Sequence, residues 1–377
     1  MTRTQTMTTQ PIKNQSKAEA MTRVNQHTSS AHRFNGVFMI ASVILGAAFA
    51  VMAHPWTADL SGKSITDGAA SHALEAELDK NIPVRQPSID AWGVLEYNLF
   101  QNGRTGVLVG QDGWLFTDEE FKRPKHFDAE IQGKLEYIAQ VKQALAANGT
   151  QLAVVVIPAK ARVYAEHLGR YKKPAYWDNV YSSFVANLKK RGVITPDALP
   201  ALEAAKSQGD LFLKTDTHFT PTGARVIAKS IAETIKASNL GLTAASFTEL
   251  PGKPVEHSGD LLKYIPMGNQ QASGPKPDTL TSSTVEGSAG GGLLGDAKLE
   301  VALVGTSYSA NDKFGFPGSL KLELGADLLN AAQEGKGPIV PMREYMKTFK
   351  ENPVKLVIWE IPERFLPVAY PETPATK

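Results

Sequence analysis

The sequence predicts an α/β protein with a mostly parallel sheet and helices on both of its faces. Continuous apolar runs of strand length recur along the chain, and such runs are typical of parallel strands buried on both faces. Segments with helical periodicity separate the runs, and alternating strands and helices imply the crossover connections of a parallel sheet. The runs are LAVVVIP at 152–158, GVIT at 192–195, LEVALVG at 299–305 and KLVIWEI at 355–361.

Helices are predicted between these runs, because apolar residues recur there at helical spacing. The first of them is expected to stop at Asn148-Gly149, a typical helix-ending pair. Nearer the N-terminus, GVLVGQDGWLF at 106–116 alternates like a β-hairpin, with its turn at Gln111-Asp112-Gly113. The predicted helical segments are 131–145, 180–188 and 227–235.

A long stretch at about 239–298 shows neither pattern and is rich in Gly, Pro, Ser and Thr. Loops of this length are usually functional or disordered, so we expect an irregular insertion here. Its segment HSGDLLKYIP at 257–266 contains enough apolar residues to be ordered. We interpret the insertion as a candidate lid or acceptor wall for a nearby site.

The N-terminal region predicts a membrane anchor. Residues 1–33 carry five Lys and Arg residues against one Glu, and the twenty residues 34–53 carry no charge. An apolar helix of this length spans a bilayer. Because positive charge precedes it, we expect 1–33 in the cytoplasm, 34–53 in the inner membrane and 57–377 in the periplasm.

A cleavable signal peptide is the alternative for this region. Ala48-Phe49-Ala50 resembles a signal-peptidase site. The leader is long, however, and the apolar run exceeds the usual apolar region of a signal peptide, which favours an uncleaved anchor. Both interpretations export residues 57–377, which we expect to form one domain that includes the insertion at 239–298.

Composition excludes several classes of function. The formal net charge is +2 and the basic residues are scattered, so a nucleic-acid-binding surface is not expected. The chain has no Cys, which rules out disulfides, a thiol nucleophile and Cys-ligated zinc. No cofactor is expected.

GTSYS at 305–309 offers a candidate nucleophile. Ser307 follows a strongly apolar run in a turn opened by Gly305. A serine there projects from the sheet edge, and free N–H groups of the turn can face a developing oxyanion. The same pattern also fits an ordinary helix N-cap, so the motif alone decides nothing.

TDTHFTPTGA at 215–224 offers the base that a serine nucleophile needs. Thr220 and Pro221 are typical of a helix start, which places Asp216 and His218 in the loop before it. Two residues apart in an extended loop, their side chains point the same way, so the carboxylate can orient the imidazole. Asp-x-His also suits a metal, but the other seven His residues are dispersed.

Four further residues are candidate substrate-binding groups: Lys160, Tyr308, Arg343 and Tyr345. Lys160 follows the run at 152–158, and Tyr308 adjoins Ser307. Arg343 precedes the last run, where its guanidinium is suited to a bidentate contact with an anionic substrate group. Each of these positions also fits an ordinary surface or packing residue.

Six motifs, taken in their order along the chain, resemble the alginate O-acetyltransferase (AlgJ/AlgX-like) family. The resemblance covers roughly residues 60–370 and implies an SGNH-hydrolase-like three-layer fold with circularly permuted elements. It also implies that the catalytic Asp, His and Ser are Asp216, His218 and Ser307. The motifs are GQDGWLFTDEE at 110–120, IPAK at 157–160, TDTHFTP at 215–221, HSGDL at 257–261, GTSYS at 305–309 and VIWEIPERFL at 357–366.

Two departures from the family pattern qualify the resemblance. Phe219 stands where the family often has Trp, a conservative change for an aromatic wall. The chain also ends soon after 357–366, whereas AlgX-like members continue into a carbohydrate-binding module. The resemblance is therefore closer to the membrane-anchored AlgJ-like members, with a weaker grip on polymer.

The resemblance implies a periplasmic O-acetyltransferase that acetylates an exopolysaccharide, with alginate as the expected acceptor, through a serine acyl-enzyme. It also implies a membrane-bound O-acyltransferase partner that supplies acetyl groups, and other exopolysaccharide acetylation and secretion proteins. Two alternatives stay open at this point. One is a polysaccharide acetylesterase that uses the same residues, and the other is a non-catalytic subunit of a secretion complex.

Overall fold

The computed structural model describes residues 14–287 and 299–370, and the chain divides into two compact units, Met1–Ile89 and Asp90–Lys377. In the first unit, the helices are α1 and α2, with a short 3-10 turn between them. Helix α3 runs across the boundary between the units. The bounds are α1 Asn14–Met52, the turn Pro55–Thr57, α2 Ala69–Asn81 and α3 Arg85–Phe100.

Helix α1 contains the predicted membrane span. The stretch Arg33–Thr57, with mean hydropathy 2.3, is long and apolar enough to cross a membrane by length and composition. Residues 14–33 of the predicted cytoplasmic tail continue the same helix, and residues 1–13 lie outside the described part of the chain. The assignment of 1–33 to the cytoplasm and 34–53 to the membrane stays a prediction.

The second unit is built on a parallel sheet with the strand order β3-β10-β8-β9. Three of these strands coincide with predicted apolar runs. The run at 192–195 contributes only a bridge from Ile194 to Ala153, and the edge strand β9 was not predicted. The strands are β3 Gln151–Ile157, β8 Val301–Val304, β9 Leu328–Asn330 and β10 Leu356–Pro362.

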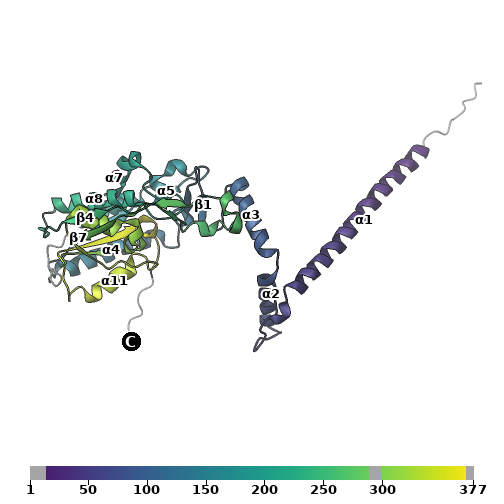
Figure 1. The fold of residues 1–377 in the computed structure, drawn as a ribbon, viewed down its shortest axis with the longest axis horizontal. Coiled ribbons are helices and arrows are strands. Elements are labelled where there is room, and N and C mark those ends of the chain that lie inside the picture. Colours follow the sequence, from purple (N-terminus) through teal and green to yellow (C-terminus); the bar gives the residue numbers. More distant parts are fainter. Residues whose placement is uncertain (1–13, 288–298, 371–377) are drawn as a thin grey trace, which may run out of the picture. The chain divides into compact units, whose positions relative to one another are not determined.

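Helices cover both faces of this sheet, which gives the expected three layers. In β3, Ala153 and Val155 face one apolar cluster, while Val154 and Val156 face another. Helices α7, α8 and α10 pack on the first face, and α4, α6 and α11 on the second (Figure 1). Their bounds are α4 Phe127–Ala146, α6 Val180–Lys190, α7 Ala198–Ala205, α8 Pro221–Ala237, α10 Phe316–Leu324 and α11 Ile339–Thr348.

The stretch predicted to be an irregular insertion is largely ordered. Its described part forms two antiparallel strand pairs, β4 with β7 and β5 with β6, and we call residues 247–287 the excursion. Sequence patterns missed these strands because each is only three or four residues long. The predicted insertion's last part, 288–298, lies outside the described residues. The strands are β4 Phe247–Leu250, β5 Val255–His257, β6 Asp278–Leu280 and β7 Thr284–Gly287.

The predicted hairpin is present as β1 (Val107–Val109) and β2 (Leu115–Thr117). Its turn has Asp112 at φ 55° and Gly113 at φ 80°, the left-handed conformations that tight hairpin turns require. The strands pack against Leu261 of the excursion in a third apolar cluster, which confirms that the segment 257–266 is ordered. This packing fixes the excursion against the rest of the unit.

Candidate active site

The candidate nucleophile lies at the carboxyl end of strand β8. Gly305 follows the strand, Thr306 is the N-cap of the one-turn helix α9 (Ser307–Ala310), and Ser307 is its first residue. A Cβ atom on Gly305 would lie 2.4 Å from a carboxylate oxygen of Glu360, so glycine permits this close approach. Ser307 is thus held at the sheet edge where open α/β folds collect their functional groups.

The structure brings Asp216, His218 and Ser307 together in one chain of hydrogen bonds. Nε2 of His218 lies 2.7 Å from Oγ of Ser307, and Nδ1 lies 2.6 Å from Oδ1 of Asp216. With its proton on Nδ1, the imidazole donates to the carboxylate and accepts the hydroxyl hydrogen of Ser307. This geometry supports the predicted roles of nucleophile, base and orienting anion.

The local sequence explains why the base lies here. Thr220 caps helix α8 by accepting a hydrogen bond from the N–H of Gly223, and Pro221 is the first helical residue, as predicted. Asp216 and His218 therefore lie in residues 214–218, which we call the base loop, just before the N-terminus of that helix. The loop belongs to no strand of the parallel sheet, and other segments hold it.

Asp216 is buried and receives four hydrogen bonds. Oδ1 accepts from the ring and the backbone N–H of His218, while Oδ2 accepts from Nε2 of His257 at 2.7 Å and the N–H of Asp260 at 3.1 Å. Burial disfavours the charged carboxylate, but the hydrogen bonds from His218 and His257 outweigh that cost. The pKa of Asp216 is consequently held below its ordinary value.

Aromatic rings enclose the imidazole of His218. Phe314 stacks on it with ring centroids 4.3 Å apart, and the ring of Tyr308 lies 4.6 Å away. Tyr308 is buried, its hydroxyl donates to the carbonyl of Thr217, and it accepts a hydrogen bond of 3.1 Å from Arg364. Tyr308 therefore positions the base loop, and its expected contact with substrate has no support in this geometry.

Lys160 is also enclosed by the protein, although the sequence suggested a substrate contact. Its ammonium donates to the carbonyls of Lys214 and Asp216, both at 2.9 Å, and lies over the ring of Trp114. Burial lowers the pKa of Lys160 to about 8, against the attraction of nearby carboxylates such as Asp278. Because its ammonium donates to two carbonyls of the base loop, Lys160 supports that loop.

The other two substrate-binding candidates lie on the second face of the sheet. Arg343 lies over the ring of Tyr137 of helix α4, and Tyr345 packs in the apolar cluster of α4, α6 and α11. The rings beside His218 belong to the first face, where Tyr308 and Phe314 pack. The structure does not bring Arg343 or Tyr345 to the triad, because α11 packs on the second face of the sheet.

Sequence reasoning missed three residues of the excursion that hold the base loop. His257 bonds to Asp216, the carboxylate of Asp260 accepts from the N–H of Thr217 at 2.9 Å, and Asp278 accepts from backbone N–H groups of the loop. The motif HSGDL at 257–261 was the available signal, since it joins a His and an Asp in a family-like pattern. Without the fold, nothing connected that motif to residues about forty positions earlier.

Asp216, His218 and Asp260 also offer possible metal-ligand atoms, all within 4.8 Å of one another. In this structure, however, Nδ1 of His218 and Oδ1 of Asp216 are hydrogen-bonded to each other. Nε2 of His218 faces the hydroxyl of Ser307. Both ring nitrogens are thereby arranged as in a serine triad, so the donor set fits proton transfer better than it fits a resident metal.

A protein-family comparison decides the family. The family described as "SGNH hydrolase-like domain, acetyltransferase AlgX" matches residues 107–363, well over half of the chain. The chain belongs to this family. The match includes both the base loop and the turn at Ser307.

Individual relatives of the AlgX acetyltransferase family agree with this assignment. The probable alginate O-acetylase AlgJ of Pseudomonas aeruginosa is 37% identical over 362 residues, 92% of each chain. The solved O-acetyltransferase domain of Pseudomonas putida AlgJ is 37% identical with a TM-score of 0.67, over 72% of this chain and 96% of that domain. The alginate biosynthesis protein AlgX of Pseudomonas aeruginosa is 32% identical over 68% of this chain and 55% of AlgX. The expected family, fold and O-acetyltransferase class are confirmed.

In this AlgX-family chain the nucleophile turn, residues 305–309, rests on one buried acid. Glu360 of strand β10 accepts hydrogen bonds from the N–H of Thr306 at 2.7 Å and the hydroxyl of Ser309 at 3.0 Å. Burial raises the pKa of Glu360 to about 7, although these hydrogen bonds oppose the rise. The acid thus ties the turn to the neighbouring strand.

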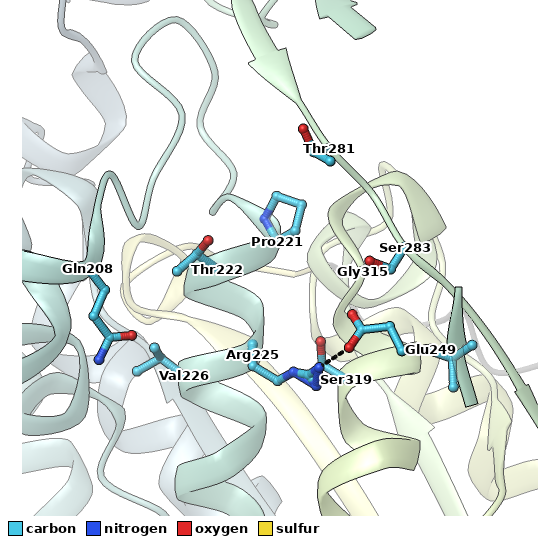
Figure 2. A pocket seen from close by; sticks show the side chains of 11 residues that line it. Gln208, Pro221, Thr222, Arg225, Val226, Glu249, Thr281, Ser283, Gly315 and Ser319 are labelled. Atoms are coloured by element: carbon cyan, nitrogen blue, oxygen red, sulfur yellow. Dashed lines mark hydrogen bonds and ion pairs between the residues drawn. The ribbon is translucent and has the colours of Figure 1, made fainter. Parts of the chain in front are cut away.

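A pocket opens on the surface of the second unit (Figure 2), and none of the residues that line it belongs to the triad. Helix α8, helix α10 and the excursion line it, beginning at Pro221, three residues after His218. Figure 2 shows Arg225 pointing across it to Glu249, with which it forms an ion pair. Hydroxyl groups make up much of the remaining lining, from Thr222, Thr281, Ser283 and Ser319.

Proposed function

We propose that this chain is a membrane-anchored periplasmic enzyme that O-acetylates an exopolysaccharide, with alginate as the favoured acceptor. Its membership in an acetyltransferase family supports the reaction, and relatives named as probable alginate O-acetylases support the acceptor. The single observation that carries the proposal is the hydrogen-bonded chain from Asp216 through His218 to Ser307.

In the first half-reaction Ser307 takes the acetyl group. Nε2 of His218 removes the hydroxyl proton as Oγ attacks the acetyl carbonyl of the donor, and the donor's leaving oxygen then takes that proton. Asp216 stabilises the imidazolium that forms between these steps without itself becoming protonated. The product is an acetyl ester on Oγ of Ser307 and a deacylated donor.

In the second half-reaction a sugar hydroxyl is the acceptor. It passes its proton to Nε2 of His218 and attacks the acetyl carbonyl, and Oγ of Ser307 leaves and regains the proton. The hydroxyl-rich pocket lined by α8, α10 and the excursion is our candidate acceptor cleft, with the excursion as one wall. Water in the same position would give ester hydrolysis instead.

The acetyl donor is expected to come from a membrane-bound O-acyltransferase, because acetyl-CoA is a cytoplasmic metabolite. The apolar stretch Arg33–Thr57 would keep the enzyme near such a partner. Relatives named as alginate biosynthesis proteins support further partners in polymer acetylation and secretion.

A reporter fusion tests the location. Residues 1–33 are basic and precede the apolar stretch, so a reporter that is active only in the periplasm should work when fused after Lys377. Activity of a cytoplasm-only reporter at the same position would refute the topology.

Slow hydrolysis of small acetyl esters by the purified full-length protein tests the site. Ser307→Ala should abolish it, with a loss of roughly 10³-fold or more, as is usual for triad serines. Near-normal turnover by Ser307→Ala would show that the nucleophile is elsewhere, and loss of turnover in a chelator would favour the metal alternative.

Polymer analysis separates the transferase from its two alternatives. Deleting the chromosomal gene should leave a secreted polymer with fewer acetyl groups, and Asp216→Ala, His218→Ala or Ser307→Ala should not restore them. Increased acetylation after deletion would instead indicate an esterase. Full complementation by the triad variants would indicate a non-catalytic subunit, and proton NMR of the polymer distinguishes these outcomes.

A further inference from the structure

We propose that His257 is a positioning residue that fixes the Asp216 carboxylate toward His218 and so keeps the base ready to act. This inference rests on the proposed acyl-transfer function of the triad. It assigns a role in that chemistry to the excursion, which lies between the base loop and the nucleophile turn in the sequence.

The first support is that the two carboxylate oxygens of Asp216 have different hydrogen-bond partners. Oδ1 serves His218, while Oδ2 accepts from Nε2 of His257 at 2.7 Å and from the N–H of Asp260 at 3.1 Å. The two imidazoles therefore do not compete for one oxygen. A carboxylate held at both oxygens cannot rotate away from His218, so its orientation is fixed before substrate binds.

The second support is that the excursion also accepts hydrogen bonds from three other residues of the base loop. Asp278, the cross-strand partner of His257, accepts from the N–H of Lys214 at 2.7 Å and of Thr215 at 2.8 Å. Asp260 accepts from the N–H and the hydroxyl of Thr217. These anchors do not involve the His257 side chain, so replacing His257 leaves the base loop attached.

The charged and titratable groups around His257 come from several elements. Asp216 and His218 face it from the base loop, Asp260 from the segment after β5, and Asp278 from β6. The Lys160 ammonium reaches the same loop at the carbonyl of Asp216. Phe314 contributes the edge-on aromatic contact, with ring centroids 6.0 Å apart.

The experiment compares His257→Leu, which removes the donor, with His257→Gln, whose amide N–H can replace Nε2. We expect His257→Leu to lower kcat for acetyl-ester hydrolysis roughly 10- to 100-fold, as expected for losing a hydrogen bond to a charged group. His257→Gln should restore most of kcat.

His167→Leu is the matched control, since His167 also contacts a carboxylate, Asp112 at 3.1 Å, but touches no triad residue. It should keep the wild-type kcat. A His257→Leu enzyme with wild-type kcat would overturn the proposal. So would equal losses of kcat in His257→Leu and His257→Gln, because packing alone would then explain them. Ser307→Ala, assayed in parallel, shows separately whether the proposed function itself fails.

Discussion

The two halves of the triad are held in different ways. The nucleophile turn grows directly out of strand β8, and one residue of the adjacent strand, Glu360, ties it down through Thr306 and Ser309. The base loop belongs to no strand of the parallel sheet. Asp278 and Asp260 of the excursion hold its backbone N–H groups instead, and Lys160 holds its carbonyls.

This difference shows how a sheet and an inserted segment share one site. The sheet positions the nucleophile, because the parallel pairing of β8 with β10 brings Gly305 beside Glu360. The insertion helps to place the base, because its Asp278 and Asp260 side chains accept hydrogen bonds from the backbone of the base loop. Changes in the excursion are therefore expected to act on the base, and changes at Glu360 on the nucleophile turn.

The largest expected effect separates two serines within the nucleophile turn. Ser307→Ala should lower kcat for acetyl-ester hydrolysis by roughly 10³-fold or more, because it removes the nucleophile. Ser309→Ala, whose hydroxyl only bonds to Glu360, should cost much less. Similar losses in both variants, measured by steady-state kinetics, would contradict the choice of Ser307.

On the base side, Asp216→Asn should lower kcat by roughly 10³- to 10⁴-fold while the protein stays folded. An amide in place of the carboxylate no longer stabilises the imidazolium and favours the wrong imidazole tautomer. Circular dichroism would confirm the fold, and kinetics the loss. Retention of most activity would show that Asp216 is not the anion that orients and stabilises His218.

An intermediate effect is expected for Asp278, which never touches the reacting groups. Asp278→Asn replaces one acceptor of the Lys214 and Thr215 N–H groups by a donor, so the base loop should shift. We expect kcat to fall roughly 10- to 100-fold, with little change in KM.

Asp327→Asn is the control for this change, since Asp327 is half exposed and pairs with Lys321 away from the base loop. It should behave like the wild type. If the Asp278 and Asp327 variants had the same kcat, the excursion would be dispensable for placing the base.

The smallest effect on activity, but a clear one on stability, is expected at Glu360. Its pKa rises from 4.5 to about 7 on folding, so it adds stability below pH 4.5 that is lost as pH rises toward 7. The loss by pH 8 amounts to roughly 3 kcal/mol. Glu360→Gln should flatten this dependence in urea unfolding at pH 5 and 8. An unchanged dependence would show that Glu360 does not titrate in this range.

The sequence predicted the parts of the site that depend on local patterns. Strands β8 and β10 are continuous apolar runs, and Thr220-Pro221 marks a helix start, so Ser307, Asp216 and His218 fell at loop positions beside a sheet edge. The short strand β9, with only Leu328–Asn330, has no such pattern. Three residues are too few to show a period.

Residues that depend on long-range packing were not predictable in this way. His257, Asp260 and Asp278 meet the base loop across about forty to sixty intervening residues. Arg343 was selected for its chemistry, but the face that α11 covers follows from packing with Tyr137 and its neighbours. Lys160 was selected for its charge, and only the fold shows that its ammonium points inward.

The most direct test of the account is to trap the acyl-enzyme. The full-length protein is mixed with an activated acetyl ester, quenched in acid and analysed by peptide mass spectrometry. The account predicts one acetyl group on the peptide that contains Ser307, absent from Ser307→Ala and strongly reduced in His218→Ala. Acetyl on Ser309, or turnover by the wild type with acetyl persisting in Ser307→Ala, would contradict it.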